Sequence, residues 1–195
     1  GNPEYQAICF GGFRENTRDI CPTVEELKED LRILAAMNIA FIRTYNTQLY
    51  PHAERTLQAI HELKQEDSNF EMFVMLGAWI ECDGAFTGKR NHEKENIVGN
   101  TAEIIRAIEL AQEYHDIVKV ISVGNESMVH WAETYSVYPK VILKYVNQLQ
   151  SLKSAEELPS DLWITSSDNF ASWGGASSDY HNNDLDSLIM AVDYV

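Results

Sequence analysis

Short apolar runs recur along the chain, and a stretch with a different spacing follows each of them. The runs rich in Ile, Val, Phe and Leu cover residues 7–10, 39–42, 72–76, 117–123 and 162–165. Most are apolar on both faces, which is typical of strands in a parallel sheet whose two faces are buried. The pattern therefore predicts five parallel strands, and residues 191–195 are expected to begin a sixth.

Between these runs, apolar positions recur every three or four residues, as they do along one face of an α-helix. Capping residues and prolines mark where such helices begin. The expected starts are marked by the capping pair Thr23 and Glu26, by Pro51, by the capping pair Asn100 and Glu103, by Pro139, and by Asp184 for a short fifth helix.

Alternating strands and helices imply an α/β fold, built either as an open doubly wound sheet or as a (β/α)₈ TIM barrel. Residues 11–16 lack the G-x-G-x-x-G turn of a nucleotide-binding open sheet, and the chain has no G-x-x-x-x-G-K-[ST]. We expect a TIM barrel, of which this chain supplies about five βα units and the start of the sixth strand. An open-sheet enzyme stays the alternative, and the strand order decides between them.

Length and composition limit the partners. The chain has 195 residues, with 30 acidic against 15 basic ones and a formal net charge of −15. This charge disfavours nucleic acid and polyanionic ligands, and no apolar run approaches the roughly 18 residues that span a membrane. Eight βα units at the observed spacing need roughly 300 residues. Residues 1–195 are therefore expected to form one incomplete barrel domain, whose strands 7 and 8 come from a C-terminal segment or a second chain.

The three cysteines, Cys9, Cys21 and Cys82, are too scattered for a disulfide framework or a zinc ribbon. They are expected to be free and mostly buried, and no metal or organic cofactor is implied. The chain begins at Gly1 without an initiating Met or an apolar signal region, which indicates a processing or tag remnant. A signal peptide removed earlier leaves no trace, so the sequence indicates no compartment.

Polar and aromatic residues gather where the expected strands end, which in a barrel is the functional face. These ends are residues 11–14, 43–46, 77–81, 124–126 and 166–169, with Trp173 close behind. They combine an arginine, a tyrosine, tryptophans and a carboxylate beside an amide. Such a set suits a carbohydrate, because sugars form paired hydrogen bonds and stack on aromatic rings, and glycosidic cleavage needs carboxyl groups.

Two strand ends resemble motifs of an enzyme family. Residues 123–126, with the sequence VGNE, resemble the (G)NE signature that ends the fourth strand of retaining TIM-barrel glycoside hydrolases. Residues 42–45, with the sequence IRTY, resemble the R-x-Y of glycoside hydrolase family 17, which contains β-1,3-glucanases and related glucosyltransferases. The whole chain is similar to the first five βα units of that barrel and the start of the sixth.

The resemblance implies a role for each matching residue. Glu126 would be the general acid/base, and Asn125 would bind the hydroxyl next to the anomeric carbon. Arg43 and Tyr45 would line the subsite at the cleaved bond and hold the second carboxylate ionised. The acid must be protonated near neutral pH, which desolvation beside another carboxylate achieves. The resemblance places the second carboxylate, a nucleophile, at the end of the seventh strand, beyond this sequence.

Other candidates rest on residue type and position. The further residues expected to bind substrate are Trp79, His130, Trp131, Asp168, Asn169 and Trp173. His130 has no second histidine at metal-binding spacing, so it is interpreted as a substrate contact or a surface residue. Asp168 and Asn169 either bind sugar hydroxyls or form a turn. Trp163 lies inside a strand and is expected in the core.

Simpler interpretations stay open for several of these residues. Asn125 and Glu126 also fit the N-terminus of a helix, and Arg43 also fits a pair with one of the surplus carboxylates. The charged residues 89–95 indicate a solvated loop or a lid.

The expected function is a retaining hydrolase of β-glucan, with β-1,3-linked glucan favoured and an oligo- or polysaccharide as the substrate. A transglycosylase using the same site is one alternative. The other is a non-catalytic carbohydrate-binding protein that lacks the nucleophile, because the acids Glu81, Asp83 and Asp168 stand on the wrong strands to supply it.

Overall fold

The backbone forms an α/β fold built on a mainly parallel sheet. The computed structural model describes residues 6–129, 131–176, 178 and 184–195. The five strands of the main sheet are β1 (Gln6–Cys9), β2 (Ile39–Arg43), β3 (Phe73–Ala78), β6 (Val118–Asn125) and β7 (Trp163–Ser167). All neighbours in this sheet pair in parallel, which confirms the predicted parallel sheet. The order β1-β2-β3-β6-β7 follows the sequence, without the reversal that marks a doubly wound sheet.

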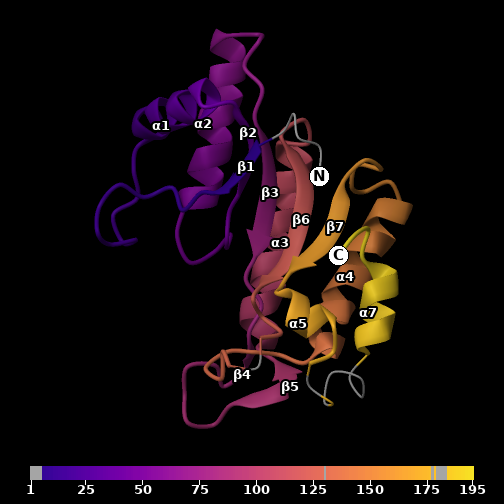
Figure 1. Ribbon diagram of the computed structural model, residues 1–195. Coiled ribbons are helices and arrows are strands. Elements are labelled where there is room, and N and C mark those ends of the chain that lie inside the picture. The colour runs from indigo at the N-terminus through magenta and orange to yellow at the C-terminus, as the bar shows by residue number, and fades with distance from the viewer. Residues whose placement is uncertain (1–5, 130, 177, 179–183) are drawn as a thin grey trace.

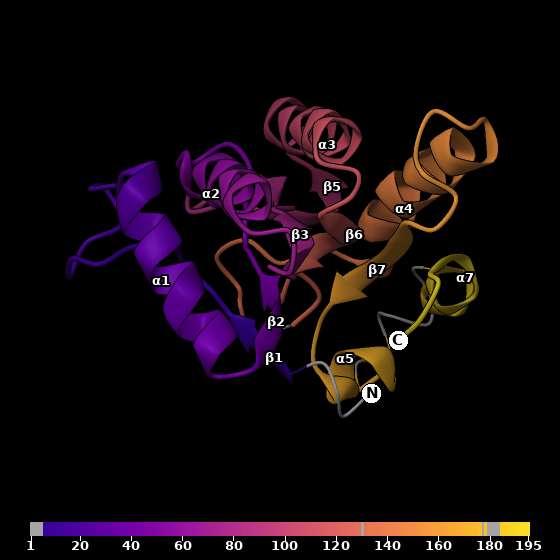
Figure 2. The same cartoon turned by 90° about the horizontal axis from the view of Figure 1, so that it is seen from above.

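Helices follow the strands and cover the outer, convex face of the curved sheet, as Figures 1 and 2 show. These are α1 (Val24–Ala36), α2 (His52–Glu66), α3 (Ile97–Glu113), α4 (Pro139–Ser154) and α7 (Leu185–Ala191). The concave face is open, and the short α5 (Phe170–Trp173) lies on that side (Figure 2). Within the described residues, no helix is long and apolar enough to cross a membrane.

The apolar faces of the helices meet the convex face of the sheet in one core. Leu27 and Leu31 of α1 and Leu57 and Ile60 of α2 are fully buried. Each such side chain contributes about 1.5–3 kcal/mol to folding through its removal from water. The periodic positions in the sequence are therefore the ones that fix the helices on the sheet.

Four of the expected helix starts are confirmed, among them Asp184, which immediately precedes α7. The hydroxyl of Thr23 accepts from the backbone N–H of Glu26, and the Glu26 carboxylate accepts from the backbone N–H of Thr23 at 2.8 Å, which completes a capping box. Pro51 immediately precedes α2, and Pro139 occupies the first turn of α4.

The expected start of the third helix at Asn100 and Glu103 is wrong. The helix begins one turn earlier, where the side chain of Asn96 accepts from the backbone N–H of Gly99 at 3.1 Å. Asn96 is an equally good capping residue and lies closer to the end of the preceding strand. Asn100 and Glu103 are buried within α3, so their side chains are available to the loops beside them.

The charged segment is not a loop throughout. Strand β5 (Asn91–Glu95) pairs antiparallel with the short β4 (Cys82–Asp83), so part of residues 89–95 forms a hairpin. The charged side chains are compatible with this pairing, because an antiparallel ribbon can pack one face against the protein and leave the other face in water.

Expectations at the two edges of the sheet also fail. Residues 191–195 form no strand; Asp193 instead donates one backbone hydrogen bond to Ile164 of β7, at 2.8 Å. Trp163, expected in the core, is 54% exposed, and its ring lies 5.4 Å from that of Tyr194. The three cysteines, expected to be mostly buried, differ in exposure: Cys82 is buried, Cys21 is half-buried, and Cys9 is exposed on β1. In the described part of the chain, the strands that carry Trp163 and Cys9 each pair with a neighbour strand on one side only.

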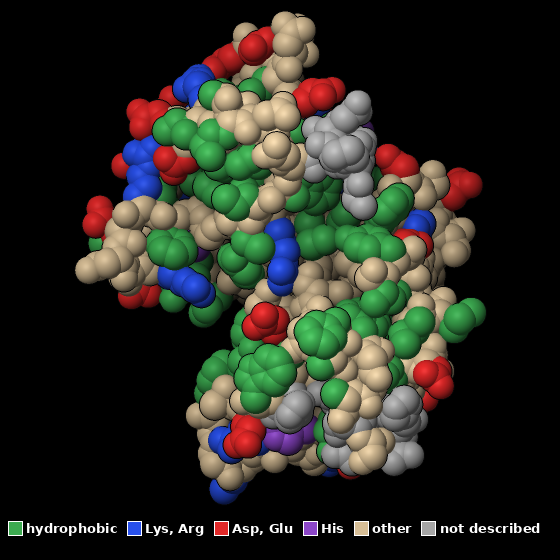
Figure 3. Space-filling model, viewed as in Figure 1, with side chains coloured by type: hydrophobic (Ala, Val, Ile, Leu, Met, Phe, Trp, Pro, Cys, Tyr) green, Lys and Arg blue, Asp and Glu red, His purple; other side chains and the backbone are tan. Residues whose placement is uncertain are grey.

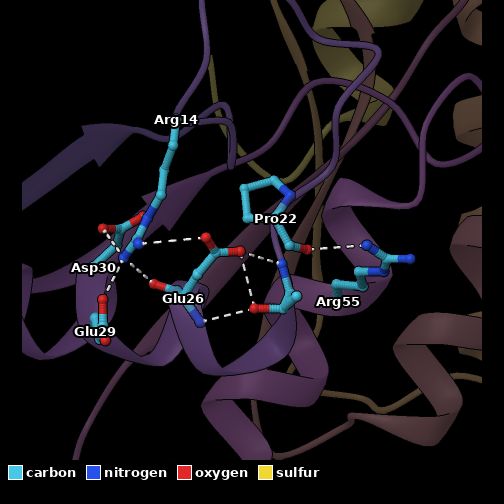
Figure 4. Close-up of polar contacts among 7 residues, drawn as sticks. Arg14, Pro22, Glu26, Glu29, Asp30 and Arg55 are labelled. Carbon is cyan, nitrogen blue, oxygen red and sulfur yellow. Dashed lines mark hydrogen bonds and ion pairs between the residues drawn. The ribbon is translucent and has the colours of Figure 1, made fainter.

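Ion pairs and hydrogen bonds hold the long loop between β1 and α1 in place. Arg14 donates to Glu29 and Asp30 at 2.9 Å each and to the backbone carbonyl of Glu26 at 2.6 Å (Figure 4). From α2, Arg55 donates to the carbonyl of Pro22 at 3.0 Å. The loop is thereby held against both helices at the amino end of α1.

Candidate functional site

The carboxyl ends of β2 and β6 bring together three of the predicted site residues. Arg43 ends β2, and its guanidinium donates a hydrogen bond to the side-chain oxygen of Asn125, which ends β6. The guanidinium carbon also lies 5.6 Å from the ring centroid of Tyr45. Burial raises the pKa of the Tyr45 phenol, so this hydroxyl is neutral at physiological pH. Arg43 thus contacts an amide and an aromatic ring at the centre of the site.

The backbone turns sharply where Glu126 follows β6. Gly124 has φ +86°, and a side chain there would come within 2.8 Å of the Ser127 hydroxyl. Glu126 itself has φ +50°, an unusual value for a residue other than glycine. Its N–H donates to the carbonyl of Ser167 on β7 at 2.7 Å, which fixes the turn to the neighbouring strand. No helix begins at this turn, so the alternative that Asn125 and Glu126 cap a helix is wrong.

Glu126 lines a cavity on the open face, which we call the acid cavity. Its volume is about 670 Å³, and its lining includes Arg43, Met75, Glu126, Asp168, Asn169, Trp173 and Tyr194. Figure 3 looks onto the side of the molecule shown in Figure 1, where hydrophobic side chains surround a basic group with an acidic group close to it. The predicted candidates Asp168, Asn169 and Trp173 therefore share one cavity with Glu126.

Asp168 and Asn169 hold backbone segments of the acid cavity in place. The Asp168 carboxylate accepts from the backbone N–H of Met128 at 3.0 Å and thereby fixes the turn that follows Glu126. The side-chain oxygen of Asn169 accepts from Ser172 at 2.9 Å and caps α5. The amide nitrogen of Asn169 is buried and has no hydrogen-bond partner among the described residues.

The titration of Asp168 gives a testable pH dependence. Burial raises the pKa of Asp168 to about 7, whereas an unfolded Asp titrates near 4. The folded protein therefore binds this proton more tightly, and its free energy of unfolding falls as the pH rises from about 4 through 7. An Asp168→Asn variant keeps the acceptor for Met128 but cannot titrate. Denaturation in urea at pH 5 and pH 8 should show the variant gaining about 2–3 kcal/mol relative to the wild type at the higher pH. A difference that is independent of pH would contradict this assignment.

A second cavity adjoins the first, and we call it the aromatic cavity. It has a volume of about 770 Å³, and its lining includes Tyr45, Leu49, Trp79, Glu81, Phe86, Asn100, Glu103 and Asn125. Asn125 lines this cavity and its neighbour Glu126 lines the acid cavity, so the two meet at the end of β6. Cavities of this size are typical of sites for small molecules or for a few sugar units.

Glu103 is a site residue that the sequence analysis interpreted only as a helix cap. It is 5% exposed, and its carboxylate accepts from the backbone N–H groups of Thr47 at 2.8 Å, Gln48 at 3.0 Å and Trp79 at 3.3 Å. Burial raises the pKa of this carboxyl group. A signal was present in the sequence, since Glu103 lies on the face of α3 that also carries Ile104 and Ala107 toward the core.

One predicted residue lies in neither cavity, and another cannot be placed. Trp131 is 62% exposed and is absent from the lining of both cavities. His130 lies outside the described residues. In the described part of the chain, no cluster of three or more His, Cys, Asp or Glu side chains could hold a metal ion.

Comparison with known proteins adds one similar structure. No family model matches the chain, and no curated protein matches it significantly. The crystal structure of an endo-laminarinase from Formosa Hel1_33_131 is 58% identical to the chain, with a TM-score of 0.94. The match covers 99% of this chain and 49% of that protein, so the chain spans about half of its length.

Proposed function

We propose that this chain is part of a β-1,3-glucan hydrolase that cleaves its substrate internally. The observation that supports this most strongly is the 58% identity, over nearly the whole chain, to a protein described as an endo-laminarinase. The acid cavity is consistent with it, because Glu126 lies at the carboxyl end of a parallel strand beside an amide and an arginine. The proposed reaction requires neither a metal ion nor an organic cofactor.

We infer a retaining mechanism in which Glu126 is the general acid and base. Glu126 gives its proton to the glycosidic oxygen as the bond to the anomeric carbon breaks, and a second carboxylate attacks that carbon. Glu126 then takes a proton from water, whose oxygen replaces the second carboxylate on the sugar. Asn125 would bind the hydroxyl next to the anomeric carbon.

Arg43 has a position suited to the second carboxylate. Its guanidinium is fixed by Asn125, and its Nε atom is buried without a hydrogen-bond partner among the described residues. A nearby positive charge favours the ionised form of a carboxyl group, which is the form that attacks. We propose that the nucleophile comes from chain beyond these residues and lies close to Arg43.

The order of the strands and the open edges of the sheet support a closed barrel. The strands pair in sequence order, and among the residues that the structure describes β1 and β7 each pair with a neighbour strand on one side only. Open strand edges of this kind invite further pairing. We propose that residues 1–195 form five βα units of a TIM barrel of the family 17 type, and that further chain adds the remaining strands and closes the sheet.

The test is the activity and stereochemistry of the full-length protein on laminarin. We expect a mixture of oligosaccharides early in the reaction, which marks internal cleavage, and no activity on a β-1,4-glucan. Proton NMR of fresh products should show the β-anomer first, because two successive displacements retain configuration. First appearance of the α-anomer would refute the retaining mechanism, and failure to cleave any β-glucan would refute the function.

A further inference from the structure

Phe86 adopts an unfavourable conformation at the tip of the β4–β5 hairpin. Its φ is +61°, a left-handed value that bulky residues rarely adopt, and its side chain is 64% exposed. The backbone is held there by a hydrogen bond from the Phe86 N–H to the carbonyl of Thr134, at 2.7 Å. Strain that the surroundings maintain is often found at ligand-binding positions, so the exposed ring needs an explanation.

Phe86 is one end of a row of three aromatic rings. The ring of Tyr135 lies 5.8 Å from that of Phe86 and 4.7 Å from that of Trp79. Trp79 and Phe86 line the aromatic cavity, whereas Tyr135 is not among its lining residues and supports both rings from outside. The row leads from the end of β3 to the hairpin, which extends past the carboxyl ends of the strands (Figure 1).

Polar contacts fix the inner ring of this row. The indole N–H of Trp79 donates to Glu81 at 2.9 Å, and the other oxygen of Glu81 accepts from the side chain of Asn96 at 2.8 Å. The backbone N–H of Trp79 donates to Glu103. Rings that are already ordered lose little conformational freedom when a ligand stacks on them.

We propose that Phe86, together with Trp79, forms a stacking platform for glucose units of a long β-glucan, beyond the units bound at Glu126. The inference rests on the proposed function and deepens it, because it assigns a preference for long chains to the aromatic cavity. Asn125 lines the same cavity at the end of β6, so a chain bound at the catalytic residues can continue along the aromatic row. The apolar C–H faces of a neutral sugar match a flat aromatic ring.

The experiment compares long and short substrates in the full-length protein. For Phe86→Ala we expect kcat/KM on polymeric laminarin to fall roughly 3- to 10-fold, mainly through KM, because one stacked ring is lost. The shortest oligosaccharide that the wild type cleaves should be cleaved at an unchanged rate. Phe86→Tyr should restore the wild-type value, since it keeps the ring. Ile33→Ala is the matched control, because Ile33 is also exposed, at 59%, but lies on α1.

Any result other than the expected one would contradict either the stacking platform or the proposed hydrolase function. Equal losses on long and short substrates would show that Phe86 acts on the fold alone, and no loss on either would refute the platform. If the wild type cleaves no β-glucan, calorimetric titration with laminarin separates the two proposals. Binding that Phe86→Ala weakens would support the platform without the hydrolase, and absence of binding by the wild type would overturn both.

Discussion

Replacing Glu126 by glutamine is expected to lower kcat on laminarin by about 10²- to 10⁴-fold, the usual contribution of a general acid and base. This corresponds to about 3–5 kcal/mol of barrier height. Glutamine has nearly the same shape, but it cannot give a proton to the departing oxygen or accept one from water. The turn should survive, because it depends on the Glu126 backbone N–H and on Gly124 rather than on the carboxylate.

The leaving group provides a sharper test of this assignment. A dinitrophenyl glycoside departs without protonation, so the first step in Glu126→Gln should stay fast on such a substrate. The second step should remain slow, because no base activates water, and a burst of dinitrophenol should precede slow turnover. Azide needs no deprotonation and should restore turnover.

A nearby acid supplies the control for Glu126. Glu133 lies on the exposed loop that follows the turn, and it lines neither cavity. Glu133→Gln removes one negative charge from the same region and should keep the wild-type rate. Wild-type activity in Glu126→Gln would show that the acid lies elsewhere.

The main features of the fold followed from local patterns in the sequence. Runs that are apolar on both faces, with helical stretches between them, predicted the parallel sheet. The capping box at Thr23 predicted the start of α1. Such signals suffice because burial and capping depend on residues close in sequence. The pairing of β4 with β5 was missed, since it joins short polar segments whose pattern resembles a loop.

The site was predictable only where topology determines it. Arg43 and Asn125 are 82 residues apart, and their contact follows from the meeting of parallel strand ends at one edge of the sheet. The orientation of buried polar side chains does not follow from that rule. Glu103 has the spacing of a helix cap after Asn100, but an equally good cap one turn earlier, at Asn96, left Glu103 inside α3, facing two loops.

Replacing Glu103 by alanine is expected to lower the free energy of unfolding by about 3–5 kcal/mol. The carboxylate accepts from three backbone N–H groups, of Thr47, Gln48 and Trp79, and an unsatisfied buried donor costs about 1–3 kcal/mol. The sum is an upper limit, because water can reach some of these groups once the side chain is gone. Denaturation in urea measures the change.

The same substitution should also reduce activity, because Glu103 fixes the loops that follow β2 and β3 and so positions Tyr45 and Trp79. Glu109→Ala on the same helix is the matched control. Its carboxylate is 54% exposed and pairs only at the surface, so its loss should cost less than about 1 kcal/mol. If the two variants lost equal stability, the hydrogen bonds of Glu103 would contribute no more than an exposed ion pair. The loops at the site would then be held by apolar packing instead.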